Sequence, residues 1–111
     1  MPDLDLRAAI HLLLHVLAPL AVARAFWPSR WRIAAAWMLA GWAIDIDHLL
    51  ADPVYAPGRC SIGFHPLHTW PAMTAYAALM VPRRTRWLGT GLVIHVALDA
   101  LDCVLMACSR D

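Results

Sequence analysis

The sequence predicts an all-α fold: a four-helix integral membrane bundle with a short third helix, forming a single domain over residues 1–111. Two observations carry this prediction. Hydrophobic residues make up 61% of the chain and the mean hydropathy is +0.58, which leaves too little polar surface to coat a soluble globule. The apolar residues also fall into stretches of about twenty, the length that an α-helix needs to cross a bilayer.

The charged residues exclude one class of function. The formal net charge is +1, and the chain contains neither Lys nor Glu, so the basic footprint of a nucleic-acid-binding protein is absent. The polar side chains are mainly Asp, His and Arg. The chain begins with acidic residues before its first apolar stretch, whereas a cleavable export signal is basic there. We therefore expect the first segment to remain in the mature protein.

The first two apolar stretches predict a helical hairpin. Leu4–Trp27 and Trp31–Leu50 are each long enough to cross a bilayer. The short connection "WPSRW" contains Pro28, and its tryptophans are of the kind that lie at a membrane interface. The two helices are therefore expected to run antiparallel.

The second half of the chain predicts a loop, a short helix and a long helix. After Asp52, several prolines and glycines indicate a loop, and Thr69 is a candidate N-cap. Residues 70–81 form a helix of about a dozen residues, which is too short to span a membrane alone. Trp87–Cys108 completes the bundle as a fourth helix of full length.

The arginines predict the orientation of the bundle. They gather in the first and the last connection, and such connections usually face the cytoplasm. The six residues are Arg24, Arg30, Arg32, Arg83, Arg84 and Arg86. Both termini and the central loop are then expected on the extracytoplasmic side.

All six histidines and four aspartates are predicted to meet in one layer. At about 1.5 Å per helical residue, most of them lie roughly 18–26 Å from the cytoplasmic interface, with His95 nearer the middle of the membrane. The layer therefore falls in the extracytoplasmic half of the bundle. Its ten members are His11, His15, Asp45, Asp47, His48, His65, His68, His95, Asp99 and Asp102.

Spacing along the helices places most of these residues on shared faces. Residues three, four or seven positions apart lie on one side of an α-helix. The sets with this spacing are His11 with His15, Asp45 with His48, and His95 with Asp99 and Asp102. Asp47 points elsewhere unless its helix unwinds near the end.

This layer is interpreted as a metal site. Uncompensated carboxylates at such depth cost a few kcal/mol each, and crowding them adds repulsion. Divalent cations remove both penalties, and the charge of four carboxylates equals that of two divalent cations. Imidazole with carboxylate is the donor set of zinc, iron or manganese, so we expect two or three divalent ions, zinc first. The alternative is a polar network that only holds the helices together.

Four stretches of the chain also resemble a known family. "HLLLH", "DIDHLL", "CSIGFHPLHTW" and "HVALDALDC" are similar to small metal-dependent hydrolases of the bacterial inner membrane. More remotely, they resemble the LexA-binding, inner-membrane-associated hydrolases, and through these the zinc-dependent phospholipase C and P1-type nuclease group. The resemblance implies a multi-pass protein of the bacterial inner membrane with metal ligands at the matched positions, Asp45, Asp47, His48, His68, His95 and Asp99.

The chain departs from that broader group in two places. Its loop reads "HPLH", with two residues between the histidines where the group has four, so His65 is either a ligand or a neighbour of the ligands. The soluble enzymes also use their amino-terminal amine and a Glu as ligands. This chain shows no equivalent of either.

The ligand set predicts hydrolysis of a phosphate ester. Clustered divalent ions bring the pKa of a bound water toward neutrality, and the resulting hydroxide attacks phosphorus in line. Asp47 or Asp102 is the candidate general base. Arg59 either binds the phosphate through two hydrogen bonds or is a solvated charge on the loop. Because the site opens at headgroup depth, we expect a phospholipid or another lipid phosphate as substrate.

A non-catalytic metal-binding or ion-handling protein is the alternative function. A conduit needs polar residues that continue to the cytoplasmic face, and the fourth helix offers only "RWLGTGLVI" there. The small size of the chain is compatible with a homodimer, and "GTG" permits close helix contact.

The three cysteines permit one bridge near the predicted site. Cys60 precedes the histidine loop, and Cys103 directly follows Asp102. A bridge between them would hold the central loop over the ligand layer and leave Cys108 unpaired. The competing interpretation makes one thiolate a metal ligand.

Overall fold

The structure is a computed structural model that describes residues 6–53 and 58–109, and this part of the chain contains helices and no strand. The predicted all-α class is confirmed. The first two residues of the predicted first helix, 4 and 5, lie outside the described residues. The α-helices are α1 (Leu6–Phe26), α2 (Trp31–Ala40), α3 (Trp70–Leu79) and α4 (Arg86–Ser109). The 3₁₀ helices are η1 (Pro28–Arg30), η2 (Gly41–Leu50) and η3 (Pro66–His68).

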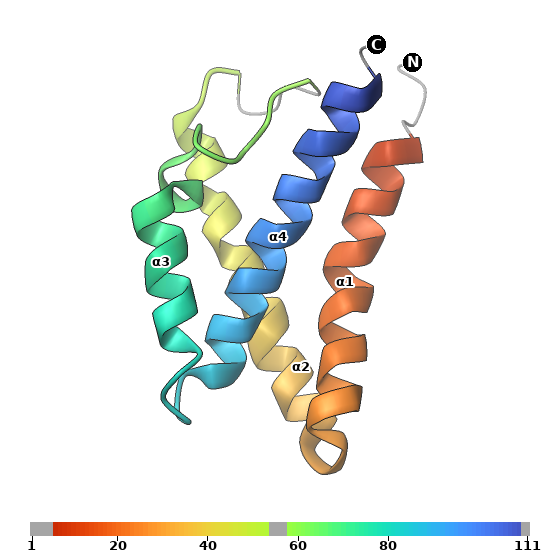
Figure 1. Ribbon diagram of the computed structural model, residues 1–111, viewed down its shortest axis with the longest axis vertical. Coiled ribbons are helices and arrows are strands. Elements are labelled where there is room, and N and C mark those ends of the chain that lie inside the picture. Colours follow the sequence, from red (N-terminus) through yellow and green to blue (C-terminus); the bar gives the residue numbers. More distant parts are fainter. Residues whose placement is uncertain (1–5, 54–57, 110–111) are drawn as a thin grey trace.

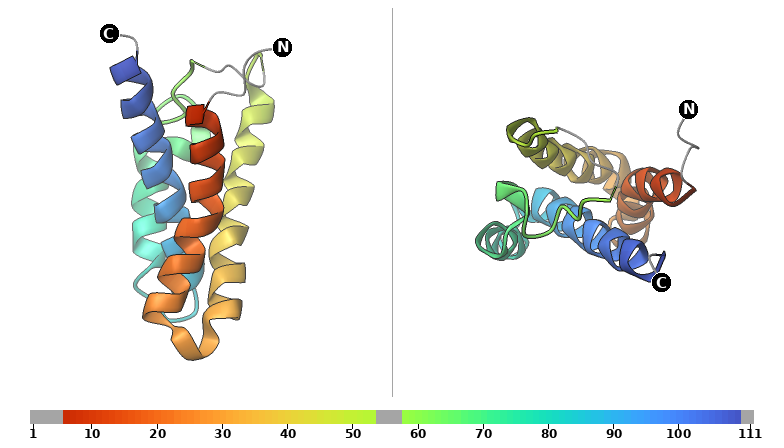
Figure 2. Two further views of the ribbon diagram at one scale, coloured as in Figure 1. Left: turned by 90° about the vertical axis from the view of Figure 1, so that its right-hand side faces the viewer. Right: turned by 90° about the horizontal axis from the view of Figure 1, so that it is seen from above.

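Helix α4 is the centre of the bundle and contacts α1, α2 and α3 (Figure 1, Figure 2). Helices α1 and α2 form the predicted antiparallel hairpin, joined through η1. We call the half of the bundle with η1 and the α3–α4 connection the arginine half. The other half, with the Leu6 end of α1, η2, the central loop and the end of α4, is the ligand half (Figure 1).

Within residues 6–53 and 58–109, three helical segments are long and apolar enough to cross a membrane. They are Leu6–Phe26, Pro28–Leu50 and Arg86–Cys108. Helix α3, with 10 residues, is too short to do so alone, as predicted. Large apolar side chains on the outside of the bundle, including Leu13, Leu17 and Ile33, are exposed, as expected for a surface that faces lipid.

Small residues bring the helices of the arginine half close together. The buried cluster there consists of Ala23, Ala34, Ala35 and Met38. A Cβ at Gly91 would lie 2.3 Å from the backbone oxygen of Met38, so only glycine permits this approach of α4 to α2. A Cβ at Gly89 would lie 2.7 Å from the backbone of Leu79 in α3. Both glycines of "GTG" thus serve contacts within the chain, and this pattern no longer bears on a homodimer.

The second membrane segment changes from α-helix to 3₁₀ helix halfway along. In η2 every third residue shares a row, because a 3₁₀ helix has 3.0 residues per turn. The exposed row is Ala43, Ile46 and Leu49. In an α-helix, with 3.6 residues per turn, the side chains of Asp45, Asp47 and His48 would spread over an arc of about 160° around the helix axis. In a 3₁₀ helix, with 3.0 residues per turn, this arc is about 120°. The change in helix type therefore brings all three side chains to the bundle side. Asp47 was expected to join the layer only if its helix unwound, whereas the observed change is to a more tightly wound helix.

The predicted disulfide is confirmed. Cys60 and Cys103 are bonded, with their Cα atoms 5.2 Å apart and 43 positions apart in the sequence. Cys108 is free and exposed, also as predicted. The bridge fastens the central loop to α4 next to Asp102, in the ligand half.

Candidate metal centre

The structure brings nine of the ten predicted ligands together in three groups. Within each group, one donor atom per residue lies within 4.8 Å of the others. We call Asp45, His68, His95 and Asp99 the inner group; His11, His15 and Asp99 the α1 group; and Asp47, His48 and His65 the η2 group. Asp99 belongs to two of them. The tenth residue, Asp102, accepts from Arg7 and lies with Oδ2 3.9 Å from Nδ1 of His11.

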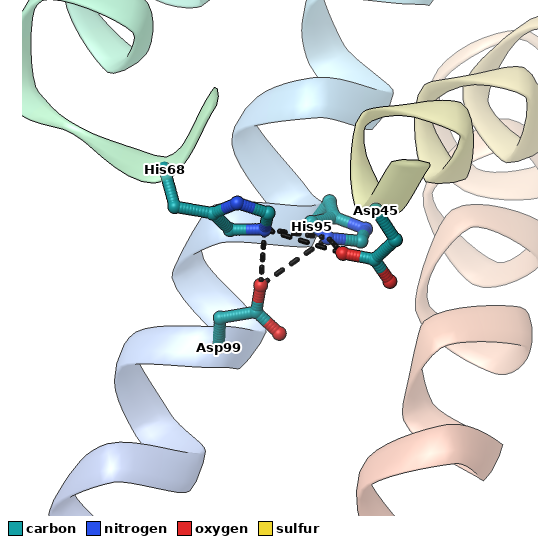
Figure 3. A group of neighbouring side chains, drawn as sticks. All are labelled: Asp45, His68, His95 and Asp99. Carbon is teal, nitrogen blue, oxygen red and sulfur yellow. Dashed lines mark hydrogen bonds and ion pairs between the residues drawn. The ribbon is translucent and has the colours of Figure 1, made fainter. Parts of the chain in front are cut away.

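The inner group has the spacing of a tetrahedral site (Figure 3). The Nε2 atoms of His68 and His95 lie 3.3 Å apart. One oxygen of Asp45 and one of Asp99 each lie 3.0–3.3 Å from both nitrogens. Four donors at about 2.0–2.1 Å from a central zinc would be about 3.3–3.4 Å apart. The donor atoms are thus close to the separation that a tetrahedrally coordinated zinc imposes.

Asp47 holds His68 in position for this group. Its Oδ2 accepts from Nδ1 of His68 at 2.9 Å and from the backbone N–H of Leu67 at 2.8 Å. The hydroxyl of Tyr76 donates to the carbonyl of Leu67 at 2.7 Å. With Nδ1 carrying the hydrogen, Nε2 of His68 presents its lone pair to the inner group, an arrangement typical of metal-bound histidine.

Carboxylates also decide the protonation of His68. Burial alone would lower the pKa of this histidine, but its hydrogen bonds to Asp45, Asp99 and Asp47 outweigh burial and raise the pKa to about 10. A metal ion therefore competes with a tightly held proton. In contrast, burial and the neighbouring His48 lower the pKa of His65, which keeps its ring neutral, as a ligand must be.

The α1 group shares Asp99 with the inner group. Oδ1 of Asp99 lies 3.2 Å from Nε2 of His11 and 3.3 Å from Nε2 of His15. Nδ1 of His15 donates to the backbone carbonyl of His11 at 2.8 Å, which again leaves Nε2 as the lone-pair nitrogen. Within the described residues, this buried Nε2 of His15 has no hydrogen-bond partner. Unsatisfied buried atoms of this kind are what a metal ion would complete.

The η2 group lies on the far side of His68. Nδ1 of His48 lies 3.0 Å from Oδ1 of Asp47, and the rings of His48 and His65 stack with centroids 3.8 Å apart. Both oxygens of Asp47 are thus engaged, and the residue is 3% exposed. These contacts favour a positioning role for Asp47 over the predicted role as general base.

A cavity of about 210 Å³ opens beside the α1 and η2 groups. Its walls come from α1, η2, the central loop and α4, and they are Arg7, Ala8, His11, Leu12, His48, Arg59, Ser61, His65, Asp102 and Met106. The predicted phosphate residue Arg59 lines it, with a hydrogen bond of 3.0 Å to the Pro53 carbonyl and its guanidinium 4.7 Å from the centre of the Phe64 ring. The inner group does not line this cavity.

Sequence reasoning missed two residues that support the site. Arg7 lies four positions before His11, the same spacing that linked His11 to His15, so this signal could have found it. The other residue is Tyr76 of α3. Its ring does pack in the α3–α4 core, but its hydroxyl fixes the loop that carries His68.

The polar layer does not continue into the arginine half. Among the described residues, Thr90 is the only buried polar side chain on that side of His95. The space between α1, α2 and α4 there is filled by the Ala23 cluster with Trp27, Trp31 and Ile94 around it. This arrangement disfavours an ion conduit through the bundle.

The chain belongs to a family of unknown function, DUF6122, whose match covers residues 5–106. No curated protein and no solved structure matches the chain. The family match spans all ten predicted ligands and both arginines of the cavity, and its description assigns them no role. The resemblance to inner-membrane hydrolases therefore stays a prediction.

Proposed function

We propose that this protein is a membrane-embedded, multinuclear metal-dependent hydrolase that cleaves a phosphate ester of a lipid. One observation carries the proposal. Asp99 joins a compact four-ligand group to a three-ligand group that faces a cavity with two arginines. A storage or purely structural site has no need of the cavity or its cations.

The two groups that share Asp99 differ in the way that structural and catalytic metal sites differ. The inner group supplies four protein donors, and the α1 group supplies three. Three protein ligands leave one position for water or substrate, which is typical of catalytic zinc. When bound, such metals acidify water and neutralise the phosphoryl oxygens. We expect zinc because of the donor spacing, with iron or manganese as alternatives.

The other residues of the cavity have roles that follow from their chemistry. In the net reaction, water adds across a P–O bond and yields an alcohol and a phosphate. Arg59 binds the phosphoryl oxygens as a charge-assisted donor. Asp102 remains the candidate base, since it reaches the cavity wall from α4. Asp47 orients His68 from behind.

The proposed location is the bacterial inner membrane, with the arginine half toward the cytoplasm and both termini outside. The disulfide in the ligand half supports this sidedness, because disulfides persist in oxidising compartments. A reporter fused after Arg84 is expected to be cytoplasmic.

The competing function is a non-catalytic metal-binding protein. The separation of the inner group from the cavity favours it, because four protein donors can close a coordination sphere. Metal content alone does not distinguish the two functions.

Metal analysis followed by a hydrolysis screen tests the proposal. Purified protein should hold at least two transition-metal ions, one for each group that shares Asp99. It should release phosphate from a lipid phosphomonoester, lose this activity on chelation and regain it on reloading with zinc. Arg59→Gln should lower the rate and keep the metal. If the protein holds its full complement of metal and hydrolyses no lipid phosphate, the proposal is wrong and the non-catalytic metal-binding function is favoured.

A further inference from the structure

The cavity is lined by ionic and by apolar side chains. The ionic residues are Arg7 and Asp102, which pair between α1 and α4, and Arg59 on the loop. The apolar residues are Ala8, Leu12 and Met106, from the same two helices as the pair. Leu12 is 56% exposed, so an apolar lining residue also belongs to the surface that faces lipid. A ligand with an anionic head and an apolar tail matches this combination.

Arg7 is held so that it presents a fixed positive charge to the cavity. Its guanidinium pairs with Oδ1 of Asp102, and its side chain is 17% exposed. A guanidinium carries five donors in a planar fork, which suits phosphate oxygens. Arg7 comes from α1 and Arg59 from the loop, so two cations from separate elements meet in one cavity.

Size and charge select the headgroup. The volume of about 210 Å³ is below the roughly 300–1,000 Å³ of most small-molecule sites, which favours a compact headgroup. Two arginines favour a dianion and oppose the ammonium group of a choline headgroup. A phosphomonoester satisfies both conditions.

The cavity has residues of α1 and of η2 in its lining. Helices α1 and α2 pack together in the arginine half, whereas α1 and η2 diverge toward the ligand half (Figure 1, Figure 2). The cavity lies in that divergence, between His11 and Leu12 of α1 and His48 of η2. Neither His15 nor Trp42 lines this cavity, and their rings stack with centroids 5.5 Å apart.

We infer that a phosphomonoester lipid reaches this cavity sideways from the bilayer, between α1 and η2, and that Arg7, positioned by Asp102, binds its phosphate together with Arg59. This inference rests on the proposed function, because it names the substrate class of the same site. It assigns Oδ1 of Asp102 to the positioning of Arg7, and Oδ2 is the atom that the proposed function uses as the base.

Binding without turnover tests the inference. One probe is the non-hydrolysable phosphonate analogue of dioleoyl phosphatidic acid. The other is dioleoyl phosphatidylcholine, which has the same acyl chains. Metal-loaded protein in nanodiscs should bind the phosphonate at least about tenfold more tightly than phosphatidylcholine. Arg7→Gln should weaken phosphonate binding by about 10- to 100-fold, as expected for lost charge-assisted hydrogen bonds, with metal content and phosphatidylcholine binding unchanged. The control is Arg84→Gln in the arginine half, which should change neither the binding of the two lipids nor the metal content.

A second variant tests the path, and a third guards against misfolding. Leu12→Trp should slow binding of the lipid phosphonate several-fold and leave binding of water-soluble phenylphosphonate unchanged. An equal effect on both probes, or on neither, contradicts lateral access. If Arg7→Gln misfolds because Asp102 is left unpaired, the double variant R7Q/D102N removes both charges and should show the same loss of phosphonate binding.

The outcomes separate the inference from the proposed function. Equal binding of phosphonate and phosphatidylcholine, or no effect of Arg7→Gln with the metal retained, overturns the inference. Selective, Arg7-dependent binding without hydrolysis of any lipid phosphate overturns the hydrolase and leaves the lipid-phosphate site. If the protein hydrolyses a lipid phosphate and Arg7→Gln does not change the rate, the proposed hydrolase function stands and the inference about Arg7 is wrong.

Discussion

The two halves of the bundle hold their helices together by different means. In the arginine half, the contacts are apolar and close, through the Ala23 cluster and through Gly91 against Met38. In the ligand half, the buried surface is ionic, and a disulfide fastens the loop to α4. Packing in the first half is complete with the chain alone. The second half buries aspartates and histidines that water no longer solvates, so its stability should depend on metal.

Asp99→Asn is expected to have the largest effect, because this carboxylate serves both the inner and the α1 group. The variant should lose bound metal and at least about 3–5 kcal/mol of stability, the usual cost of leaving buried charged groups without their partner. Metal analysis and thermal unfolding of the purified protein measure both effects.

The matched control is Asp52→Asn, which makes the same change at an exposed position outside the three groups. It should leave metal content and stability unchanged. After exhaustive chelation, the difference in stability between wild type and Asp99→Asn should shrink to the part that comes from the ion pairs of Asp99 with His68 and His95. A wild type that is equally stable with and without metal would contradict the comparison of the two halves.

Removing the disulfide should have the next largest effect. Replacing Cys60 and Cys103 by Ser opens a loop with a sequence separation of 43, for which chain entropy gives about 4 kcal/mol. Unfolding of the double variant and of reduced wild type measures the loss. The control is Cys108→Ser, since this thiol is exposed and free. A loss confined to the arginine half in hydrogen exchange would contradict the assignment of the bridge to the ligand half.

Gly91→Ala tests the arginine half and should have a smaller effect. The added methyl group meets the backbone of Met38, so we expect a loss of about 1–3 kcal/mol from overpacking. Metal content should stay the same, and the loss should persist after chelation. A simultaneous loss of metal would show that the two halves are coupled through α4.

The pH dependence of metal binding should be the most gradual effect. Because the pKa of His68 is raised to about 10, its ring holds a proton across the neutral range, and metal must displace it. Apparent zinc affinity should therefore rise with pH between about 6 and 9, by up to about tenfold per pH unit for each proton released. Titration with a competing chelator at several pH values measures the slope. A flat or falling profile would show that His68 is not a ligand.

The sequence was sufficient to predict the helices because their main signal is length. Leu6–Phe26 and Arg86–Cys108 are apolar almost throughout, and no competing structure satisfies so many backbone groups in a membrane. Depth counted along each helix then predicted which polar residues would meet. The bridge from Cys60 to Cys103 followed from the same layer.

Other features were not accessible from the sequence because they depend on the packing between segments. The sharing of Asp99 depends on α1 lying against α4, which spacing within one helix does not report. The pairing of Asp102 with Arg7 depends on the same contact. Asp47 was predicted as a ligand and a base; the loop that returns over it occupies one oxygen with Leu67 and His68, and Asp47 remains in the η2 group of candidate ligands. Periodicity alone could not reveal η2, because apolar spacings of three and four residues suit both helix types.

The 3₁₀ form of η2 also changes how far the second segment reaches. Ten residues rise about 2.0 Å each in place of about 1.5 Å, so this half is roughly 5 Å longer than the same residues in an α-helix. The added reach carries His48 toward the loop that supplies His65 and His68. It also fixes the register, since inserting one residue after Gly41 would rotate all that follows by about 120° and turn ligands toward lipid. An insertion of three residues would restore the rotation but move the ligands that follow by about 6 Å along the helix axis, so the length of this segment is fixed as well as its register.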